Sequence, residues 1–466
     1  MPRVLSLLLV SLTLPSAAFA LCTGSEPTTV CPSSCTETSL KDAIESAGNN
    51  EEICVIGSVT ESSRIDLDSG NRVIVRTDET GDVSITYNNS NGPQIYVRNG
   101  SDLEIHDIIL GTTSQERGVE VNGGTITLVN AYASQHTDNQ AGMVIWGDSS
   151  SVIEIVGGTF EQNGRNDQNG GVIYSDNGTV SISGDAVFRQ NNGLYGGAIY
   201  TGGSSGLTIT DATFIDNTAN NEGGAVYLDQ TDNVTIRRGF FCDNQADSGG
   251  GIFAYLQADN LDIQGSVFID NDATNGDGGG VRQYSGSVTM ANNHFVGNDA
   301  TDQGAGYWVR SASGEFANNI VQDNLDDGLY DRNNNPDLTI TNNAWHNNAN
   351  DVDSDNSKTN DQSTGPFVAW TVGACDIAEL EPFGAAIDNG DTSYGADPSG
   401  DTNTDIGAFG GPHGYDLYVD LDGDTYFSDV DCDDDNPNIF PGAAETPGDS
   451  IDQDCDGVDD CYLDAD

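Results

Sequence analysis

Basic residues are scarce in this 466-residue chain, which has 15 Lys and Arg against 74 Asp and Glu and a formal net charge of −59. Phosphate binding needs clustered Lys and Arg, so this balance excludes nucleic acid as a partner and disfavours docking on anionic lipid. Hydrophobic residues are only 36% of the chain, and beyond the N-terminal segment no window is apolar enough for a transmembrane helix. The 57 glycines and the weak helical periodicity disfavour a helical bundle. What remains is an acidic, β-dominated protein.

The first twenty residues have the pattern of a secretory signal peptide. Arg3 supplies the positive start, Val4 to Leu14 form the apolar run, and Ala18-Phe19-Ala20 is a small-x-small cleavage site. We therefore expect export, to the extracellular space or the outer cell surface. Export implies an oxidising compartment, in which disulfides persist.

Nine cysteines are consistent with that compartment. Four lie near the mature N-terminus and predict two bridges, two in the acidic C-terminal region predict a third, and the pairing of the remaining three stays open. A zinc site near the N-terminus is disfavoured because no His follows closely. The four N-terminal cysteines are Cys22, Cys31, Cys35 and Cys54, and the C-terminal pair is Cys432 and Cys455. The three whose pairing stays open are Cys242, Cys375 and Cys461.

Internal repetition is the strongest signal in the sequence. A Phe-x-x-Asn motif recurs at intervals of 24 to 28 residues, with Val or Trp in place of Phe in the last copies. Two small residues followed by an apolar strand recur between the copies, as in Gly196-Gly197-Ala198-Ile199-Tyr200. The motif residues are Phe160 and Asn163, Phe188 and Asn191, Phe214 and Asn217, Phe241 and Asn244, Phe268 and Asn271, Phe295 and Asn298, Val321 and Asn324, and Trp345 and Asn348.

Three short strands in about 26 residues, separated by Gly, Asn and Asp turns, are typical of one coil of a right-handed parallel β-helix. Coils of this kind stack about 4.8 Å apart, which buries the face that a single coil leaves open. We expect the repeated Phe to form an internal stack and the repeated Asn an amide ladder. Ser39 to Ala47 fits a short amphipathic helix, with a capping box of Ser39 and Asp42, that closes the N-terminal end.

The two motifs resemble the F-x-x-N and G-G-A-[ILV] repeats of chlamydial polymorphic outer-membrane proteins and related bacterial β-helix proteins. Ala385 to Pro412 resembles the A-I-D-x-G-D … D-I-G-A-[FY] ending of bacterial surface β-helix proteins, which implies a last coil and exit. The predicted organisation is a signal peptide (1–20), a disulfide-tied N-terminal cap (21–52), the β-helix (53–350), a final coil and exit segment (351–412) and an acidic Ca-binding module (413–466).

The C-terminal module holds 18 acidic residues and no Lys or Arg between positions 416 and 466. Its carboxylates alternate along short loops, as oxygen ligands of Ca²⁺ do, although a strict EF-hand is doubtful and a solvated acidic tail is the alternative. The stretch resembles the MopE-like metal-binding motif of secreted bacterial proteins, and the absence of His disfavours copper. The candidate ligands are Asp420, Asp422, Asp424, Asp431, Asp433, Asp435, Asp452, Asp454 and Asp456, with Cys432 and Cys455 pinning the loops together.

One outward-facing column of the β-helix is rich in aromatic residues. If the preceding Ile or Val points inward, the column reads Tyr174, Tyr200, Tyr227, Phe253, Arg282, Trp308 and Tyr330. An exposed stripe of this kind could stack on sugar rings, and Arg282, Arg310 and Arg332 occupy similar places in successive coils. The alternatives are cross-coil stacking for stability alone and arginines that merely neutralise an acidic face. The candidate binding residues are Tyr227, Phe253, Arg282, Trp308, Arg310 and Tyr330.

These features predict a secreted or cell-surface protein that binds glycan or matrix in the manner of an adhesin. A polysaccharide lyase or glycoside hydrolase of the pectin-lyase-like fold is the alternative, and a structural spacer is a third option. Acidic residues are so frequent that no pair of them marks a catalytic site, and no residue is predicted to be catalytic. The ligand, the anchoring mode and the oligomeric state stay open.

Overall fold

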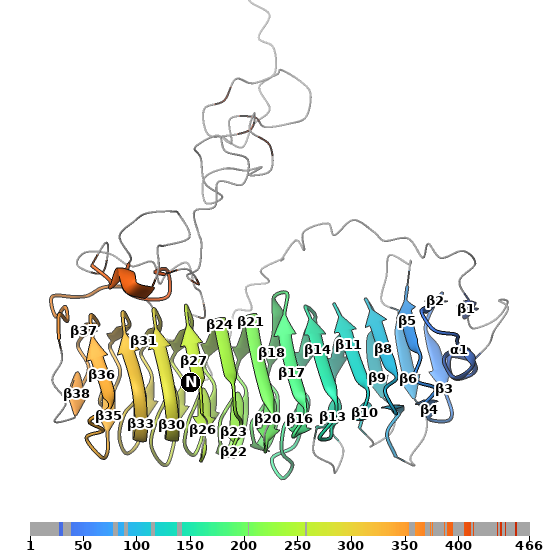
Figure 1. The fold of residues 1–466 in the computed structure, drawn as a ribbon, viewed down its shortest axis with the longest axis horizontal. Helices are drawn as coiled ribbons and strands as arrows, with labels where there is room; N and C mark the ends of the chain where they lie inside the picture. Colours follow the sequence, from blue (N-terminus) through green and yellow to red (C-terminus); the bar gives the residue numbers. More distant parts are fainter. Residues whose placement is uncertain are drawn as a thin grey trace, which may run out of the picture.

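Successive coils of the chain build a long parallel β-helix, as Figure 1 shows. Each coil passes through three sheets, here called the first, second and third faces, and five coils add a strand to a small fourth sheet. The computed structural model describes residues 28–30, 39–77, 83–87, 92–112, 117–137, 142–203, 205–256, 259–353 and 359–368, with short segments and single residues between 373 and 453. In this part of the chain no helix is both long and apolar enough to cross a membrane.

The first face consists of strands that follow the small-residue turns. Its pairing is in register and parallel, so that Ile173, Ile199 and Val226 lie on one another in three successive coils. The strands of this face are β4 (Ile65–Leu67), β7 (Ile95–Arg98), β10 (Val119–Asn122), β13 (Ile145–Gly147), β16 (Ile173–Asp176), β20 (Ile199–Gly202), β23 (Val226–Asp229), β26 (Ile252–Ala254), the first parts of β30 (Val281–Ala291) and β33 (Tyr307–Ala317), β35 (Leu329–Asp331) and β38 (Val352–Asp353).

The second face alternates buried aliphatic residues with partly exposed polar ones, which is the period of a strand with one buried side. Its strands are β1 (Thr28–Val30), β2 (Glu51–Val55), β5 (Arg72–Arg76), β8 (Asp102–His106), β11 (Thr125–Val129), β14 (Val152–Val156), β17 (Thr179–Ser183), the first parts of β21 (Gly206–Ile215) and β24 (Val234–Cys242), β27 (Leu261–Gln264), the last parts of β30 and β33, and β36 (Leu338–Thr341).

The third face carries the repeated Phe residues, and it continues directly into the fourth sheet. Its strands are β3 (Val59–Glu61), β6 (Ser84–Tyr87), β9 (Ile109–Thr112), β12 (Tyr132–Ser134), β15 (Thr159–Glu161), β18 (Ala186–Arg189), the last parts of β21 and β24, β28 (Val267–Ile269), β31 (His294–Val296), β34 (Ile320–Gln322) and β37 (Ala344–His346). The fourth sheet consists of β19 (Asn192–Tyr195), β22 (Thr218–Glu222), β25 (Gln245–Ala246), β29 (Asp272–Ala273) and β32 (Asp299–Ala300).

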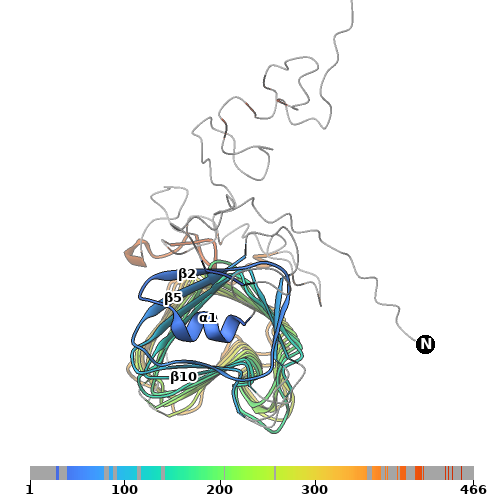
Figure 2. The same ribbon diagram turned by 90° about the vertical axis from the view of Figure 1, so that its right-hand side faces the viewer.

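A short helix covers the N-terminal end of the core, as predicted. Figure 2 shows α1 (Leu40–Ser46) lying across the open end of the coil. The Ser39 hydroxyl oxygen accepts a hydrogen bond from the backbone N–H of Asp42 at 3.2 Å, which confirms the N-cap. Buried Glu61 accepts from the N–H groups of Leu40 and Lys41, so the helix N-terminus is satisfied from the coil beneath it.

The repeated Phe residues form the predicted stack inside the helix. Neighbouring rings from Phe160 to Phe295 lie 4.8 to 5.1 Å apart and nearly parallel, all of them fully buried. Where Val321 replaces Phe, Phe316 from the second face fills the gap between Phe295 and Trp345. Aromatic pairs contribute about 0.5–1.5 kcal/mol beyond their buried area, so the stack stabilises each interface between the coils from Phe160 to Phe295.

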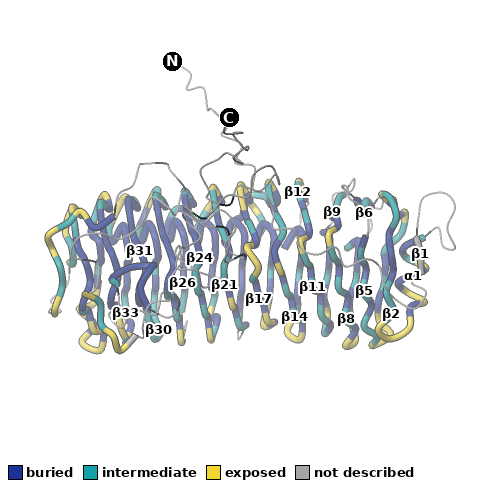
Figure 3. Tube along the Cα trace, turned by 90° about the horizontal axis from the view of Figure 1, so that it is seen from above, coloured by how far each residue is buried: buried dark blue, intermediate teal, exposed yellow. Residues whose placement is uncertain are grey.

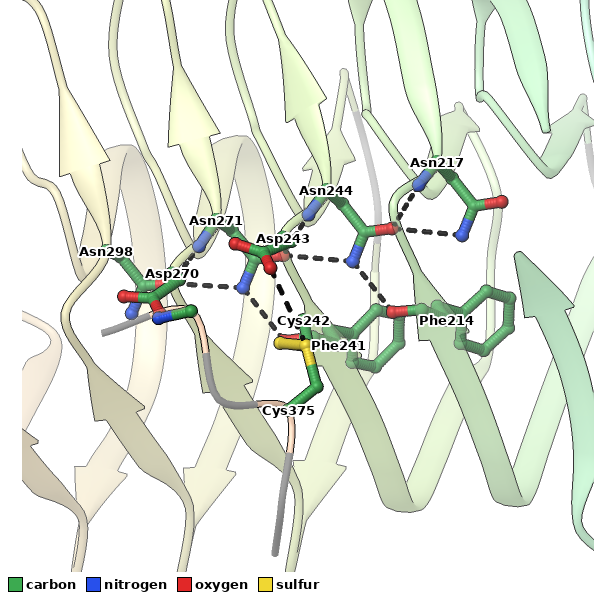
Figure 4. The surroundings of a disulfide bond; sticks show 11 residues. Phe214, Asn217, Phe241, Cys242, Asp243, Asn244, Asp270, Asn271, Asn298 and Cys375 are labelled. Atoms are coloured by element: carbon green, nitrogen blue, oxygen red, sulfur yellow. Dashed lines mark hydrogen bonds between the residues drawn. A yellow bond between two sulfur atoms is a disulfide. The ribbon is translucent and has the colours of Figure 1, made fainter. Parts of the chain in front are cut away.

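The repeated Asn residues form the predicted amide ladder. The backbone N–H and the side-chain N–H of Asn217 both donate to Oδ1 of Asn244 at 3.0 Å, and Asn244 makes the same two bonds to Asn271. The amides from Asn191 to Asn324 also donate to the carbonyl of a Phe in the preceding coil, as Asn244 does to Phe214 at 2.9 Å (Figure 4). The ladder therefore satisfies backbone groups at a buried turn, where strand pairing is interrupted.

A second amide ladder, which was not predicted, lies at the turn between the second and third faces. Asn293 donates to Oδ1 of Asn319, and Asn319 to Oδ1 of Asn343, both at 3.0 Å. Asp361 takes the next place and accepts from the backbone N–H of Asn343 at 2.8 Å. The Asn-Asn pair is the sequence signal that indicates this ladder. The first Asn of each pair adopts the positive φ of the turn, as Asn318 does at 53°, and the second Asn forms the ladder.

The chain that follows the last coil folds back onto the third face, and its described residues from Phe367 to Gly411 are here called the C-terminal strap. Phe367, Val368, Ala386, Ile406, Ala408 and Phe409 pack against outward-facing residues of that face, among them Phe240, Val267 and Ile320. Figure 3 shows buried residues along the strands and exposed ones mostly at the turns. The A-I-D … D-I-G-A segment, predicted to be a last coil, thus lies beside Asn318, where the N–H of Gly407 donates to the Asn318 carbonyl at 2.7 Å.

A disulfide between Cys242 and Cys375 ties the strap to the third face across 133 residues. This pairing was left open by the sequence. Nearby, the N–H of Gly373 donates to the Asp270 carboxylate at 2.5 Å, and Figure 4 shows Asp243 beside the bridge. Burial raises the pKa of Asp243 to about 6, and the carboxylates of Asp270 and Asp216 add to the rise. Cys54 is also disulfide-bonded.

Asn244→Ala tests the amide ladder. The substitution removes the acceptor of two N–H groups of Asn217 and the donor to the Phe214 carbonyl, all of them buried. Since each orphaned buried group costs about 1–3 kcal/mol, we expect a loss of at least about 2 kcal/mol in urea denaturation. Asn220→Ala, an exposed Asn of β22, is the control, and equal effects of the two variants would contradict the role of the ladder.

His294 tests how the strap is held. The ring is fully buried against Phe409, neither nitrogen has a hydrogen-bond partner among the described residues, and burial lowers its pKa from 6.5 to about 3. Above about pH 6.5 the His294 ring is neutral whether the strap is open or closed, so it does not oppose closure. Below that pH an exposed ring gains a proton and the buried ring does not, so protonation increasingly favours the open strap. We therefore expect strap opening to rise about tenfold per pH unit from 6.5 to 4.5 in the wild type relative to His294→Leu.

Hydrogen exchange of the Ile406 and Gly407 amides measures this opening, because both are bonded in the closed strap. The ratio of wild type to variant at each pH cancels the intrinsic rate. His346→Leu, a half-buried histidine on the same face, is the control. A ratio that stays constant with pH would show that His294 does not become exposed when the strap opens.

Candidate functional site

The aromatic column lies on the first face in the predicted register. Tyr174 pairs with Tyr200, Tyr200 with Tyr227, and Tyr227 with Phe253. The full column reads Asp66, Tyr96, Glu120, Trp146, Tyr174, Tyr200, Tyr227, Phe253, Arg282, Trp308, Tyr330 and Asp353. Trp146, which sequence reasoning missed, begins the stacked rings, with its ring centroid 6.3 Å from that of Tyr174.

Arg282 continues the stack where an aromatic ring is missing. Its guanidinium carbon lies 4.8 Å from the ring centroid of Phe253 and 4.6 Å from that of Trp308. The same guanidinium pairs with Asp277 at 3.1 Å and with Glu222 at 3.7 Å. Burial lowers the pKa of Arg282, and the two carboxylates oppose that change. The bonding capacity of Arg282 is thus directed mainly at the protein itself.

Much of the column is covered, so the predicted exposed stripe is wrong for three of the candidate residues. Tyr227, Phe253 and Trp308 are 5%, 1% and 0% exposed. Rings or guanidinium groups cover both faces of these side chains, and the small-residue turns approach their Cβ atoms. A Cβ added to Gly304, which has φ of 67°, would lie 2.8 Å from the Cβ of Trp308. Direct stacking of a sugar on Trp308 is therefore excluded in this conformation.

A second outward column, two residues further along each strand, forms the accessible surface of the same face. Tyr255 and Tyr284 lie 5.4 Å apart, and the guanidinium of Arg310 lies 4.4 Å above the Tyr284 ring. The next coil contributes Arg332, whose backbone N–H donates to the Val309 carbonyl at 2.9 Å. The register therefore places Arg310 and Arg332 in one column, two residues beyond that of Arg282, although the guanidinium of Arg332 lies 5.9 Å from the Trp308 ring that Arg282 also contacts. Tyr255 and Tyr284 were missed, although the period of two between outward residues indicates them.

A pocket of 320 Å³ opens between the fourth sheet and the turns that lead into the first face. Tyr195, whose ring lies 5.0 Å from that of Tyr227, forms one wall. Burial raises the pKa of the Glu222 carboxyl, Arg282 opposes this rise, and Asp247 adds to it. The lining consists of Tyr195, Asn221, Glu222, Asp247, Ser248 and Asn275, so the pocket offers carboxylate, amide and hydroxyl groups.

The predicted metal ligands from Asp420 to Asp456, and Cys432 with Cys455, lie outside the described residues. Among the residues that the structure describes, the one group with metal-ligating spacing is Cys242, Asp243 and Cys375. Its two sulfur atoms form the disulfide, so they are not available as thiolate ligands.

Two protein-family models match the chain. Residues 197–365 match a family described as "Right handed beta helix region", which agrees with the predicted fold, including its hand. Residues 431–460 match a family described as "Putative metal-binding motif", of the MopE type that the sequence predicted. No curated protein matches the sequence. The resemblance to polymorphic outer-membrane proteins stays a prediction.

Several solved structures are similar at low identity. One is the A-module of the mannuronan C-5 epimerase AlgE6 of Azotobacter vinelandii, with 14% identity and a TM-score of 0.41 over 70% of this chain and 93% of that chain. Another is a PL6 alginate lyase in complex with a trisaccharide, with 13% identity and a TM-score of 0.45 over 84% of this chain and 96% of that chain. Neither similarity is high enough to indicate a shared activity.

Proposed function

We propose that the protein is an exported, adhesin-type surface protein that binds polysaccharide along the first face of its β-helix. The observation that carries the proposal is the accessible aromatic and arginine surface. Tyr284 and Arg310 of the second outward column and half-buried Tyr330 of the first column form it, beside a buried stack that holds it rigid. Rungs about 4.8 Å apart give this surface the form of a linear track, which suits an extended polymer.

Sugar recognition combines apolar contact with a few polar groups, and the first face offers both. Tyrosine presents a large, rigid ring with a polar tip, and it contributes binding area at low entropic cost. The pocket beside the column offers Tyr195, Asn221 and Ser248 for hydrogen bonds to hydroxyl groups. Its 320 Å³ lies at the lower end of the range of about 300–1,000 Å³ that is typical of ligand pockets.

A glycoside hydrolase is the second candidate function, because Glu222 and Asp247 line the same pocket. A carboxyl group with a raised pKa beside a second carboxylate is the pattern of a general acid and its partner. Incubation of the mature protein with neutral and acidic polysaccharides, followed by an assay for new reducing ends, decides this point. Product that disappears in Glu222→Gln would replace the binding proposal with a catalytic one.

The C-terminal module is proposed to bind Ca²⁺. The donor set predicted from the sequence consists of carboxylate oxygens, which are the ligands that this hard cation prefers, and it includes no His. A bound cation would relieve the repulsion among close carboxylates and so stabilise the module.

Tyr330→Ala and Tyr174→Ala test the binding face. Both side chains are half-buried members of the column, so their removal takes away contact area without opening the core. We expect at least a fivefold loss of affinity for the bound polysaccharide in affinity electrophoresis, with circular dichroism unchanged. Tyr132→Ala, a half-buried tyrosine of the third face, is the control. If it weakens binding equally, the first face is not the binding surface.

Metal removal tests the module. We expect Ca²⁺ titration of the EDTA-treated protein to release heat and raise the thermal midpoint, and Asp454→Asn with Asp456→Asn to abolish both effects. Mg²⁺ and Cu²⁺ titrations are run beside it. Tighter binding of Cu²⁺ than of Ca²⁺, or no heat with either cation, would contradict the assignment.

A further inference from the structure

Ion pairs occupy nearly all of the arginines that the structure describes. Arginines on all three faces have a carboxylate oxygen within 4.0 Å, as expected in a chain with 74 acidic and 15 basic residues. These are Arg64, Arg72, Arg76, Arg98, Arg117, Arg165, Arg189, Arg237, Arg238 and Arg282. Within the described part of the chain, Arg310 and Arg332 alone have no such partner.

The two unpaired arginines are neighbours. They stand in adjacent coils on the first face, one residue beyond the paired Val309 and Asp331. The Arg310 guanidinium is held 4.4 Å above the Tyr284 ring, and that of Arg332 lies 5.9 Å from the Trp308 ring. Arg310 is half-buried and Arg332 is exposed. Aromatic contact fixes the plane of each guanidinium and leaves its N–H groups, which make no hydrogen bond to the described residues, for another partner.

Two of the carboxylates near this pair are already engaged. Asp331 is 3% exposed and accepts from the backbone N–H of Asn335 at 2.7 Å, so it points away from the surface. Burial raises the pKa of Asp277, and the positive charge of Arg332 opposes that rise. The ion pair of Asp277, at 3.1 Å, is nevertheless to Arg282. Two cations without an ion-pair partner among the described residues therefore stand together on a protein whose formal net charge is −59.

We propose that Arg310 and Arg332, with Tyr255, Tyr284 and Tyr330 beside them, form a subsite for the anionic group of an acidic glycan. The inference rests on the proposed polysaccharide-binding function and names its substrate class. A guanidinium binds a carboxylate or a sulfate ester through two parallel N–H donors. One rung of about 4.8 Å separates the two backbones, so both arginines can reach one anionic group while the sugar ring contacts Tyr330 and the edges of Tyr255 and Tyr284.

Charge distinguishes this ligand from other polyanions. A duplex nucleic acid carries one charge per about 1.7 Å and needs several phosphate contacts, which two arginines on a strongly acidic chain do not supply. An acidic glycan has fewer charges per length and presents uncharged faces to the tyrosines. At about 0.15 M salt the Debye length is about 8 Å, so the distant carboxylates are screened and the direct contacts persist.

The experiment compares four probes on the mature protein at 0.15 M NaCl by affinity electrophoresis and calorimetry. The probes are a polyuronate, a sulfated polysaccharide, an uncharged polysaccharide and duplex DNA. We expect one of the acidic glycans to bind at least tenfold more tightly than the uncharged polymer, with the preferred one identifying the anionic group as carboxylate or sulfate. Equal binding of DNA would overturn the proposal, because the site would then recognise charge alone.

The variants are Arg310→Gln, Arg332→Gln and their double substitution. We expect the double variant to bind the acidic glycan at least tenfold more weakly and the uncharged polymer as before. Arg310→Lys keeps the charge but not the paired donors, so it should fall between wild type and Gln. Arg189→Gln, an exposed arginine of the third face that pairs with Glu161, makes the same charge change and should have no effect.

The outcomes separate this inference from the function on which it rests. If the wild type binds the uncharged polymer as tightly as the acidic ones, and Tyr330→Ala weakens both, the polysaccharide face stands and the anionic subsite is wrong. The same holds if the arginine variants bind acidic glycan as the wild type does. If no polysaccharide binds at all, the proposed function and the subsite fail together.

Discussion

Parallel, in-register pairing of one coil with the next is the constraint on which the rest of this structure depends. Because each strand lies on its equivalent about 4.8 Å away, every side chain has the equivalent residue of the next coil as its neighbour. A residue type is therefore tolerated at a position only if it packs against itself. Phe and Asn satisfy this condition, the first by ring stacking and the second because its amide both donates and accepts.

The same constraint makes stacked acidic residues destabilising, because carboxylates at equivalent positions of successive coils then lie next to one another on the outside of the β-helix. Asp272 pairs with Asp299 in β29 and β32, and burial together with the Asp299 carboxylate raises the pKa of Asp272 despite a hydrogen bond from Gln245. Arginines relieve this repulsion wherever they lie between carboxylates, as Arg282 does between Asp277 and Glu222. Arg310 and Arg332, which have no ion-pair partner among the described residues, thus depart from the pattern of the other described arginines.

Periodic features could be predicted from the sequence, and non-periodic ones could not. The spacing of Phe160 to Trp345 fixed the coil length, and with it the register of the aromatic column, because a constant interval translates directly into stacking. Exposure was harder to predict, since covering Trp308 depends on turns and on Arg282, which belong to other parts of the coil. The strap was beyond prediction because its contacts, such as Gly407 to Asn318, join segments with no shared period.

The difference between Arg282 and Arg310 shows why register, more than residue type, decides function on such a surface. Both are arginines of the first face that contact aromatic rings, and they are one coil and two positions apart in register. Arg282 stands in the inner column, where rings cover both sides and two carboxylates reach it. Arg310 stands in the second outward column, half-buried, with the Tyr284 ring on one side and no ion-pair partner among the described residues. An offset of two positions keeps the side chain on the outward side of the strand, but it moves Arg310 away from the carboxylates that pair with Arg282.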